Sequence, residues 1–214
     1  MKPSRYLLAA VLAFASTAWA VSADDETTGS FFRAVRRDSD MAVASALKKG
    51  VSPNLQDAKG NTGLHVALLE GMPIAAAELL KAPELDVNVL NKVGESPLMM
   101  AALKSHVDVA RTLIERGAAI NKDGWTPLHY AATGGNTDII SMLLAKGAQI
   151  DARSPNGTTP LMMAARYGST QAVQLLLQKG ANYRLSNEQK LTALDFARQG
   201  ARPDAIKILE KLAK

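Results

Sequence analysis

Apolar residues recur along this chain in short blocks separated by polar turns, and their spacing within each block is helical. Over residues 107–114 the apolar side chains stand three to four positions apart, which is the spacing of a helix that buries one face. Residues 173–177 form a similar block. Gly117 and Gly180 follow these blocks, at the place where helices often end in the left-handed conformation. The pattern predicts short helices joined by glycine-containing turns, beginning with helices over 31–37 and 40–48.

One six-residue motif occurs five times. Residues 126–131 read TPLHYA, and related sequences occupy 62–67 (TGLHVA), 96–101 (SPLMMA), 159–164 (TPLMMA) and 192–197 (TALDFA), with starts 34, 30, 33 and 33 residues apart. The leading Thr or Ser is suited to cap a helix N-terminus, and the Pro that follows in three copies is suited to the first helical turn. Each copy is therefore expected to begin a helix.

This motif at a period near 33 residues is typical of ankyrin repeats, and the chain resembles that family from about Ser30 to Lys214. The resemblance implies an all-α fold: an ankyrin-repeat solenoid of about six stacked helix pairs with short β-hairpin fingers between repeats. The spacing of 30 arises from a finger over 119–125 that is three residues short, which we expect to leave a notch. The predicted segments are an N-terminal capping repeat (30–61), four ankyrin repeats (62–95, 96–125 with the shortened finger, 126–158 and 159–191) and a C-terminal capping repeat (192–214).

The first residues read as a targeting segment. Lys2 and Arg5 precede an apolar run over residues 6–15, and Ala18-Trp19-Ala20 matches a small-x-small cleavage site. These three parts in this order predict a secretory signal peptide over 1–20, followed by a flexible leader over 21–29. A membrane anchor is the alternative, but the run is shorter than the ~20 residues that a spanning helix needs. We therefore expect a periplasmic or secreted protein that has no membrane contact after cleavage.

Composition narrows the possible functions. The chain has 214 residues, no cysteine and a formal net charge of +5, of which Lys2 and Arg5 would be lost with the signal peptide. No basic stripe with interleaved aromatic residues is present, so nucleic acid is not expected as a partner. No phosphate-binding glycine loop, nucleophile elbow or zinc-protease motif occurs, and the carboxylates are scattered. We expect no catalytic residues, no cofactor and no metal.

Several residues that suggest chemistry have a structural interpretation. The resemblance implies that His65 and His129 bridge the backbones of adjacent repeats, while Met99, Met162 and Asp195 replace that histidine. We assign the Met pairs to the core rather than to a copper site. Among the outer apolar positions, we expect Met41, Ile74, Ala77 and Leu212 to be buried. Lys190 replaces the glycine of the other fingers, so we expect the last finger to be distorted or shortened.

The resemblance also implies which surface binds a partner. Ankyrin repeats bind through the finger tips and the exposed side of the first helix of each pair, which form one concave groove. The positions that match by register are Lys59, Asn61, Leu69, Glu70, Lys92, Glu95, Lys104, Lys122, Asp123, Trp125, Thr133, Asn156, Arg166, Tyr167 and Gln189. Trp, Tyr and Arg often dominate interface energies, so Trp125 is either an exposed anchor or a side chain that packs on its own finger.

The function expected from these features is non-catalytic binding of a partner protein by a monomer. One role is an accessory or scaffold for an exported enzyme, and the alternative is an immunity-type inhibitor of a delivered toxin. The sequence does not separate the two. An alternative of another class is a carboxylate-based hydrolase or a metal carrier, which would need converging carboxylates or histidines in a deep pocket.

Overall fold

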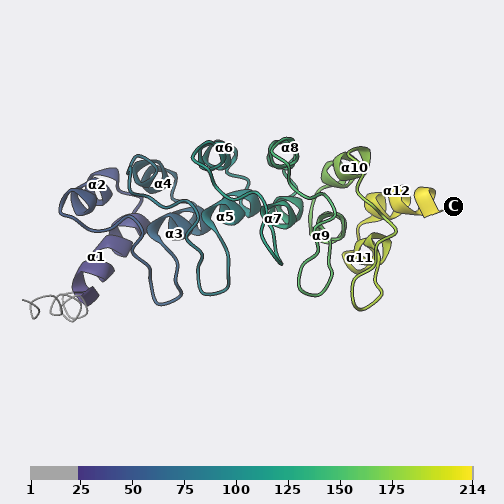
Figure 1. The fold of residues 1–214 in the computed structure, drawn as a ribbon, viewed down its shortest axis with the longest axis horizontal. Coiled ribbons are helices and arrows are strands. Elements are labelled where there is room, and N and C mark those ends of the chain that lie inside the picture. Colours follow the sequence, from purple (N-terminus) through teal and green to yellow (C-terminus); the bar gives the residue numbers. More distant parts are fainter. Residues whose placement is uncertain (1–23, 214) are drawn as a thin grey trace, which may run out of the picture.

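Pairs of antiparallel helices stack side by side along the chain in the computed structural model, which describes residues 24–213. In Figure 1 the first helices of the pairs form one row and the second helices form another, with five loops projecting beyond the row of first helices. The helices are α1 (Asp24–Arg36), α2 (Asp40–Lys48), α3 (Gly63–Glu70), α4 (Pro73–Leu79), α5 (Pro97–Leu103), α6 (Val107–Glu115), α7 (Pro127–Gly134), α8 (Thr137–Ala145), α9 (Pro160–Tyr167), α10 (Thr170–Gln178), α11 (Ala193–Gln199) and α12 (Pro203–Ala213). The expected solenoid of six helix pairs is thus confirmed.

The repeated motif begins the first helix of five of the six pairs, α3, α5, α7, α9 and α11, as predicted. Ser96 Oγ accepts a hydrogen bond from the backbone N–H of Met99 at 3.3 Å, and Thr159 Oγ1 accepts one from that of Met162 at 3.4 Å. Such a cap contributes about 1 kcal/mol to the stability of a helix. Pro97 and Pro160 then occupy the first turn, where the absent N–H leaves no helical hydrogen bond unmade.

Small residues allow successive first helices to approach each other closely. Ala131 and Ala132 in α7, like Ala164 and Ala165 in α9, are buried at the contact between neighbouring pairs. Gly168 ends α9, and a Cβ at that position would lie 2.3 Å from the backbone oxygen of Ala132. Any larger residue there would force the two helices apart.

The five fingers are irregular loops, which corrects the expectation of β-hairpins. They comprise residues 49–62, 80–96, 116–126, 146–159 and 179–192. No β-strand occurs between residues 24 and 213; isolated bridges pair Gln56 with Thr62 and Ser186 with Thr192. Polar side chains at the base of the fingers accept hydrogen bonds from backbone N–H groups that would otherwise be paired between β-strands.

Other expectations about local structure were wrong in detail. Helix α1 begins at Asp24, so residues 24–29, predicted as part of a flexible leader, are helical. Lys190 adopts a positive φ of 60°, and its finger is closed by the same backbone bonds as its neighbours, so it is neither distorted nor shortened. The predicted signal peptide over 1–20 lies outside the described residues.

Four apolar side chains expected in the core are exposed instead. Met41 is 80% exposed and Ile74 is 51% exposed, while Ala77 and Leu212 are also exposed. In α4 the buried positions are Ala75, Ala76 and Leu79. Each residue turns a helix by about 100°. An error of one position in the predicted helical register therefore places side chains that were expected to be buried on the exposed side.

Candidate protein-binding surface

The two motif histidines hold adjacent repeats together. His65 Nε2 lies 3.0 Å from the backbone oxygen of Glu95, and His129 Nε2 lies 2.9 Å from that of Thr158; each carbonyl belongs to the residue directly before the cap of the next repeat's first helix. A carbonyl only accepts, so each Nε2 carries the proton. The Nδ1 atoms then accept from Thr62 and Thr126, the capping residues of the same helices. Both side chains are fully buried, so the predicted bridging role is confirmed.

Burial sets the protonation state of these histidines. Desolvation lowers the pKa of His129 to about 4, although the hydrogen bond to Thr158 opposes the shift. The pKa of His65 is lowered for the same first reason. Each imidazole is therefore neutral near pH 7, as its hydrogen-bond pattern requires.

The residues that replace histidine lie in comparable places. Met99 and Met162 are buried, and their sulfur atoms face the backbone N–H groups of Ser96 and Thr159 at 3.2 and 3.4 Å. Asp195 accepts from the backbone N–H of Thr192 at 2.8 Å and from its hydroxyl at 2.7 Å. The hydrogen bond from Thr192 lowers the pKa of Asp195. The assignment of the Met pairs to the core is confirmed for Met99, Met100 and Met162, whereas Met163 is half-buried.

Four of the fingers share one closing arrangement. A polar residue at the base accepts backbone N–H groups farther along the loop: Asp57 Oδ1 accepts from Lys59 and Asn61, and Asn187 Oδ1 accepts from Gln189 and Leu191. Asn91 and Ser154 occupy the same position in the second and fourth fingers. In each finger the backbone N–H of the base residue also donates to the carbonyl four residues on.

The third finger is closed differently. A second set of side chains forms hydrogen bonds from one finger to the backbone of the next. Asn54 is hydrogen-bonded to residues 84 and 86, Asn88 to residues 117 and 119, and Asn121 to Gly147 and Gln149. In the first two fingers the linking residue comes three positions before the closing residue. The three-residue deletion merges both positions at Asn121, and its side chain makes the linking bonds. Lys122 Nζ instead donates to the carbonyls of Asp123 and Trp125, at 2.9 and 3.3 Å.

This shortened finger interrupts the row of finger tips. Lys92 N–H donates to the carbonyl of Lys59 at 3.1 Å, which joins the first two tips, and Glu188 N–H donates to that of Asn156 at 3.0 Å, which joins the last two. The described chain has no such bond to the third finger, which projects less far than its neighbours in Figure 1. The predicted notch is therefore present.

An apolar hollow lies beside the notch. We call it the α7 hollow; it has a volume of about 260 Å³ and is lined by Leu103, Trp125, His129, Tyr130, Thr133 and Met163. The Trp125 ring packs edge-on against His129 with centroids 5.2 Å apart. Trp125 is half-buried, so it both packs on its own repeat and forms one wall of the hollow.

The polar groups of the α7 hollow are already bonded within the chain. Tyr130 Oη donates to Glu95 Oε1 at 2.7 Å, and Thr133 Oγ1 donates to the carbonyl of His129 at 2.8 Å. Burial raises the pKa of the Tyr130 hydroxyl, and the hydrogen bond to Glu95 raises it further. The hollow thus offers a largely apolar wall to any occupant.

The predicted contact residues fall into three groups. Lys59, Glu70, Lys92, Lys104, Asp123, Asn156, Tyr167 and Gln189 are exposed, whereas Leu69, Glu95, Lys122, Trp125, Thr133 and Arg166 are half-buried. Asn61 is buried and accepts a hydrogen bond from Asn91 at 3.1 Å, so its side chain is not free on the surface as mapped. Sequence reasoning did not bring Leu103 and Met163 together with Trp125 in one hollow, because Leu103 is distant from Trp125 along the chain and Met163 belongs to another repeat.

Charge is distributed unevenly along the fingers. None of the ion pairs formed within residues 24–213 includes Lys59, Lys92 or Lys104. Glu70 pairs with Arg36 at 3.1 Å, and the Arg166 guanidinium donates to Gln199 and lies 5.0 Å from the Tyr167 ring centre. The first two fingers and the end of α5, on the N-terminal side of the α7 hollow, therefore present three unpaired lysines.

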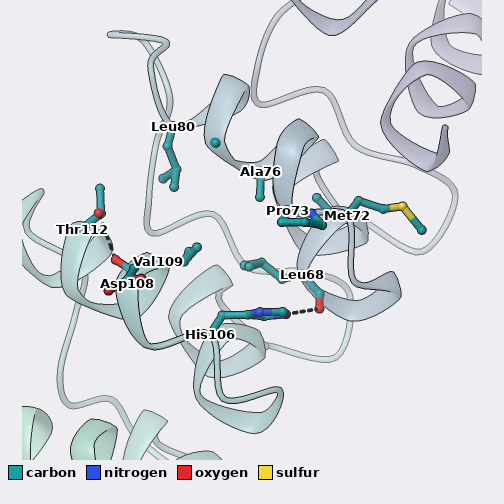
Figure 2. Close-up of a pocket in the computed structure, with 11 residues that line it drawn as sticks. Leu68, Met72, Pro73, Ala76, Leu80, His106, Asp108, Val109 and Thr112 are labelled. Carbon is teal, nitrogen blue, oxygen red and sulfur yellow. Dashed lines mark hydrogen bonds between the residues drawn. The ribbon is translucent and has the colours of Figure 1, made fainter. Parts of the chain in front are cut away.

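A second hollow lies between the outer helices α4 and α6. We call it the outer cleft; it has a volume of about 210 Å³ and is lined by Ala67, Leu68, Met72, Pro73, Ala76, Ala77, Leu80, His106, Asp108, Val109 and Thr112. Figure 2 shows His106 bonded to the carbonyl of Leu68 and Thr112 bonded to that of Asp108. The Arg116 guanidinium donates to the carbonyls of Leu80, Ala82 and Leu85, and so closes the end of α4.

The described part of the chain contains no group of three or more His, Cys, Asp or Glu side chains placed to hold a metal ion. Its helices, between residues 24 and 213, are too short or too polar to cross a bilayer. The features that the structure brings together are therefore an extended surface with a hollow rather than a deep site with converging acids and bases.

Stacked helix pairs, bridging histidines and a row of fingers define a helical-repeat protein. Residues 31–122 and 70–154 match the family described as Ankyrin repeats (3 copies), and residues 143–197 match Ankyrin repeats (many copies). These matches span well over half of the sequence, so the chain belongs to the ankyrin repeat family. Ankyrin repeats bind partner proteins, and solenoids of this kind generally use extended concave surfaces for binding.

The chain covers only a small part of the curated relatives that it resembles. It is 42% identical over 72 residues to the putative palmitoyltransferase ZDHHC13 of Danio rerio, covering 33% of this chain and 11% of that protein. It is 35% identical over 89 residues to the photoreceptor ankyrin repeat protein of Homo sapiens, covering 40% and 20%. These relatives support the repeat architecture alone.

One solved structure resembles the chain over most of its length. It is a chain of the complex titled Bd0816 predatory endopeptidase from Bdellovibrio bacteriovorus with immunity protein Bd3460, with a TM-score of 0.71 and 29% sequence identity. The match covers 85% of this chain and 97% of that chain. The similarity thus includes overall size as well as repeat type.

Proposed function

We propose that this chain is a non-catalytic, immunity-type binding protein that inhibits a partner enzyme through its finger-side surface. This surface is defined as the five fingers together with the exposed sides of α3, α5, α7, α9 and α11. The observation that carries the proposal is the match over 97% of a chain from an endopeptidase–immunity protein complex. The interrupted finger row and the α7 hollow give this surface an uneven shape, which a specific partner could match.

We infer in addition that the protein acts outside the cytoplasm. The basic start, the apolar run over residues 6–15 and the Ala18-Trp19-Ala20 site support removal of residues 1–20 on export. Amino-terminal sequencing of protein recovered from the exported fraction is expected to begin at Val21. A sequence that begins at Met1 would contradict this inference.

The inhibitory role can be separated from the scaffold role by one experiment. The full chain, expressed with its own amino terminus and immobilised, is used to capture proteins from the exported fraction of its source cell. Peptidase activity of the captured enzyme is then measured while chain is added. We expect activity to fall until one chain is present per enzyme.

A scaffold would give a different result, because the captured enzyme would retain its activity and survive heating longer when bound. Recovery of the same proteins on a solenoid of unrelated surface, such as a commercial designed ankyrin protein, would show that capture is non-specific. Either outcome would overturn the inhibitor proposal.

A further inference from the structure

The α7 hollow has the size and chemistry to receive one side chain of a partner. Its volume of about 260 Å³ is below the ~300–1,000 Å³ of pockets that bury a whole small molecule. The hydroxyls of Tyr130 and Thr133 and both ring nitrogens of His129 are bonded within the chain. A polar occupant would find few free partners there, whereas an apolar one would lose none.

The short third finger leaves the hollow accessible from the finger side. The tips of fingers one and two are bonded to each other through Lys92 and Lys59, and those of fingers four and five through Glu188 and Asn156. Trp125, at the base of the third finger, forms one wall of the hollow. A partner segment can therefore reach the hollow between the two joined pairs of tips.

The charged side chains on the N-terminal side of the α7 hollow indicate which residues of a partner would flank the side chain that enters it. Lys59, Lys92 and Lys104 are exposed and make no ion pair in the described part of the chain. The carboxylates nearby are engaged: Asp57 accepts from backbone amides and Glu95 from Tyr130 and Asn91. The exposed acids on this side are Asp123, in the shortened finger itself, and Glu70, which is paired with Arg36.

The opposite side of the notch also carries positive charge. The Arg153 guanidinium donates to the neutral carbonyl of Ser186 at 2.8 Å, so it keeps its charge, and exposed Glu188 precedes exposed Lys190 by two residues. Acidic groups are therefore attracted on both sides of the notch, and the first two fingers and α5 contribute three lysines to this attraction.

Resting on the proposed function, we propose that the α7 hollow binds a single aromatic or leucine-like side chain of the partner enzyme, whose neighbouring acidic residues lie over Lys59, Lys92 and Lys104. Buried apolar anchors in pockets commonly dominate binding energy. The lysines would speed association and fix the direction of the segment. Both parts together define the partner motif as an apolar anchor flanked by carboxylates.

The probe for this inference is a fluorescein-labelled peptide with one phenylalanine flanked on both sides by glycine and three acidic residues. Its binding to the full chain is measured by fluorescence anisotropy at low and physiological salt. Two control peptides carry alanine for phenylalanine or lysines for the acids. We expect each control to bind about tenfold more weakly or worse, and the acidic peptide to weaken as salt rises.

Two variants form a matched pair for the hollow. Thr133→Phe fills the α7 hollow, and Thr112→Phe fills the outer cleft; both threonines lie on helices and donate to the carbonyl four residues earlier. We expect about a tenfold loss of peptide binding for Thr133→Phe and none for Thr112→Phe, with both proteins folded by circular dichroism. A loss confined to Thr112→Phe would assign the peptide to the outer cleft and overturn the proposal.

A second pair tests the charges. Lys59→Glu with Lys92→Glu is expected to weaken peptide binding about tenfold and to flatten its salt dependence. Lys207→Glu with Lys211→Glu, at exposed positions of α12, makes the same change in net charge and is expected to have no effect. Equal losses in both pairs would show that only net charge matters and would contradict a directed site.

Failure of this inference can be told apart from failure of the proposed function. If Thr133→Phe and the lysine pair still inhibit the captured enzyme as the wild type does, the anchor proposal is wrong while inhibition stands. If the wild-type chain captures no enzyme, the proposed function itself fails.

Discussion

The hydroxyl of Tyr130 donates a 2.7 Å hydrogen bond to Oε1 of Glu95, joining α7 to the second finger. The other carboxylate oxygen of Glu95 accepts from Asn91 Nδ2 at 2.8 Å, and its backbone carbonyl faces His65 Nε2 at 3.0 Å. Glu95 thus connects α3, its own finger and α7. A position mapped by register to partner contact is therefore also part of the bonding between repeats.

Replacing Tyr130 by Phe removes the donor and leaves a half-buried carboxylate oxygen without this partner. We expect the free energy of unfolding to fall by about 1–3 kcal/mol, the range for hydrogen bonds to charged groups. Urea denaturation followed by circular dichroism measures the change. The exposed Tyr167→Phe is the control, and an equal effect from both variants would mean that the bond to Glu95 adds nothing.

Acid should destabilise the fold through His129 before the carboxylates titrate. Its folded pKa of about 4 lies below the ordinary histidine value of 6.5, so the unfolded chain binds more protons between these values and stability falls as pH falls from about 6.5 to about 4. A pKa shift of this size lowers the free energy of unfolding by about 3 kcal/mol once His129 is fully protonated. The lowered pKa of Asp195 acts at lower pH, because its contribution is lost only below the usual range of aspartate.

Thermal melts at pH 7 and pH 4.5 measure the effect of His129. In His129→Gln, which keeps a hydrogen-bonding side chain without a titrating group, we expect a lower melting temperature at pH 7 but a smaller drop on acidification. A drop as large as in the wild type would assign the acid sensitivity to other groups.

Arg116 should be needed for the junction between α4 and α6. Its guanidinium donates to three carbonyls at 2.6, 3.1 and 3.2 Å, which Arg116→Met would leave without these donors. We expect a loss of about 2–4 kcal/mol in unfolding free energy and faster amide exchange over residues 80–85. Arg111→Met, at an exposed position of the same helix, should have little effect; similar losses would count against this role for Arg116.

The strained backbone at Lys190 offers a stabilising substitution. Its φ of 60° is costly for a residue with a Cβ and ordinary for glycine. Lys190→Gly is expected to raise the free energy of unfolding by about 0.5–1 kcal/mol, while Lys190→Ala, which retains the Cβ, should not. Denaturant midpoints for the two variants decide the matter, and a gain in the alanine variant would point to the lysine charge instead.

The sequence predicts the repeat architecture well because it depends on local signals. Helix starts follow from the capping Thr and Ser residues, and the roles of His65 and His129 follow from their place in the motif. The sequence is a weaker guide to which face of each outer helix is buried, as the exposed Ile74 shows. Which face of α4 is buried depends on its contacts with α1, α2 and α3, which are not encoded in α4 itself.

The candidate site could be predicted only in part for a similar reason. The deletion in the third finger and the importance of Trp125 are visible in the sequence. The burial of Asn61 depends on a bond from Asn91 in the next finger, and the α7 hollow needs Leu103 and Met163 from flanking repeats. Such features arise between repeats, where the register of one unit does not specify the side chains of the next.

The third finger lacks three residues, yet α5, α7 and α9 stack on one another as their neighbours do. Asn121 preserves the link to the next finger across the deletion. Finger length is thus free to vary while the shared interior is maintained by other positions. Loop residues can therefore be added or removed by mutation, with any loss of stability confined to one repeat, and such changes alter the binding surface. Protein engineering can use the same positions to change which partner the protein binds.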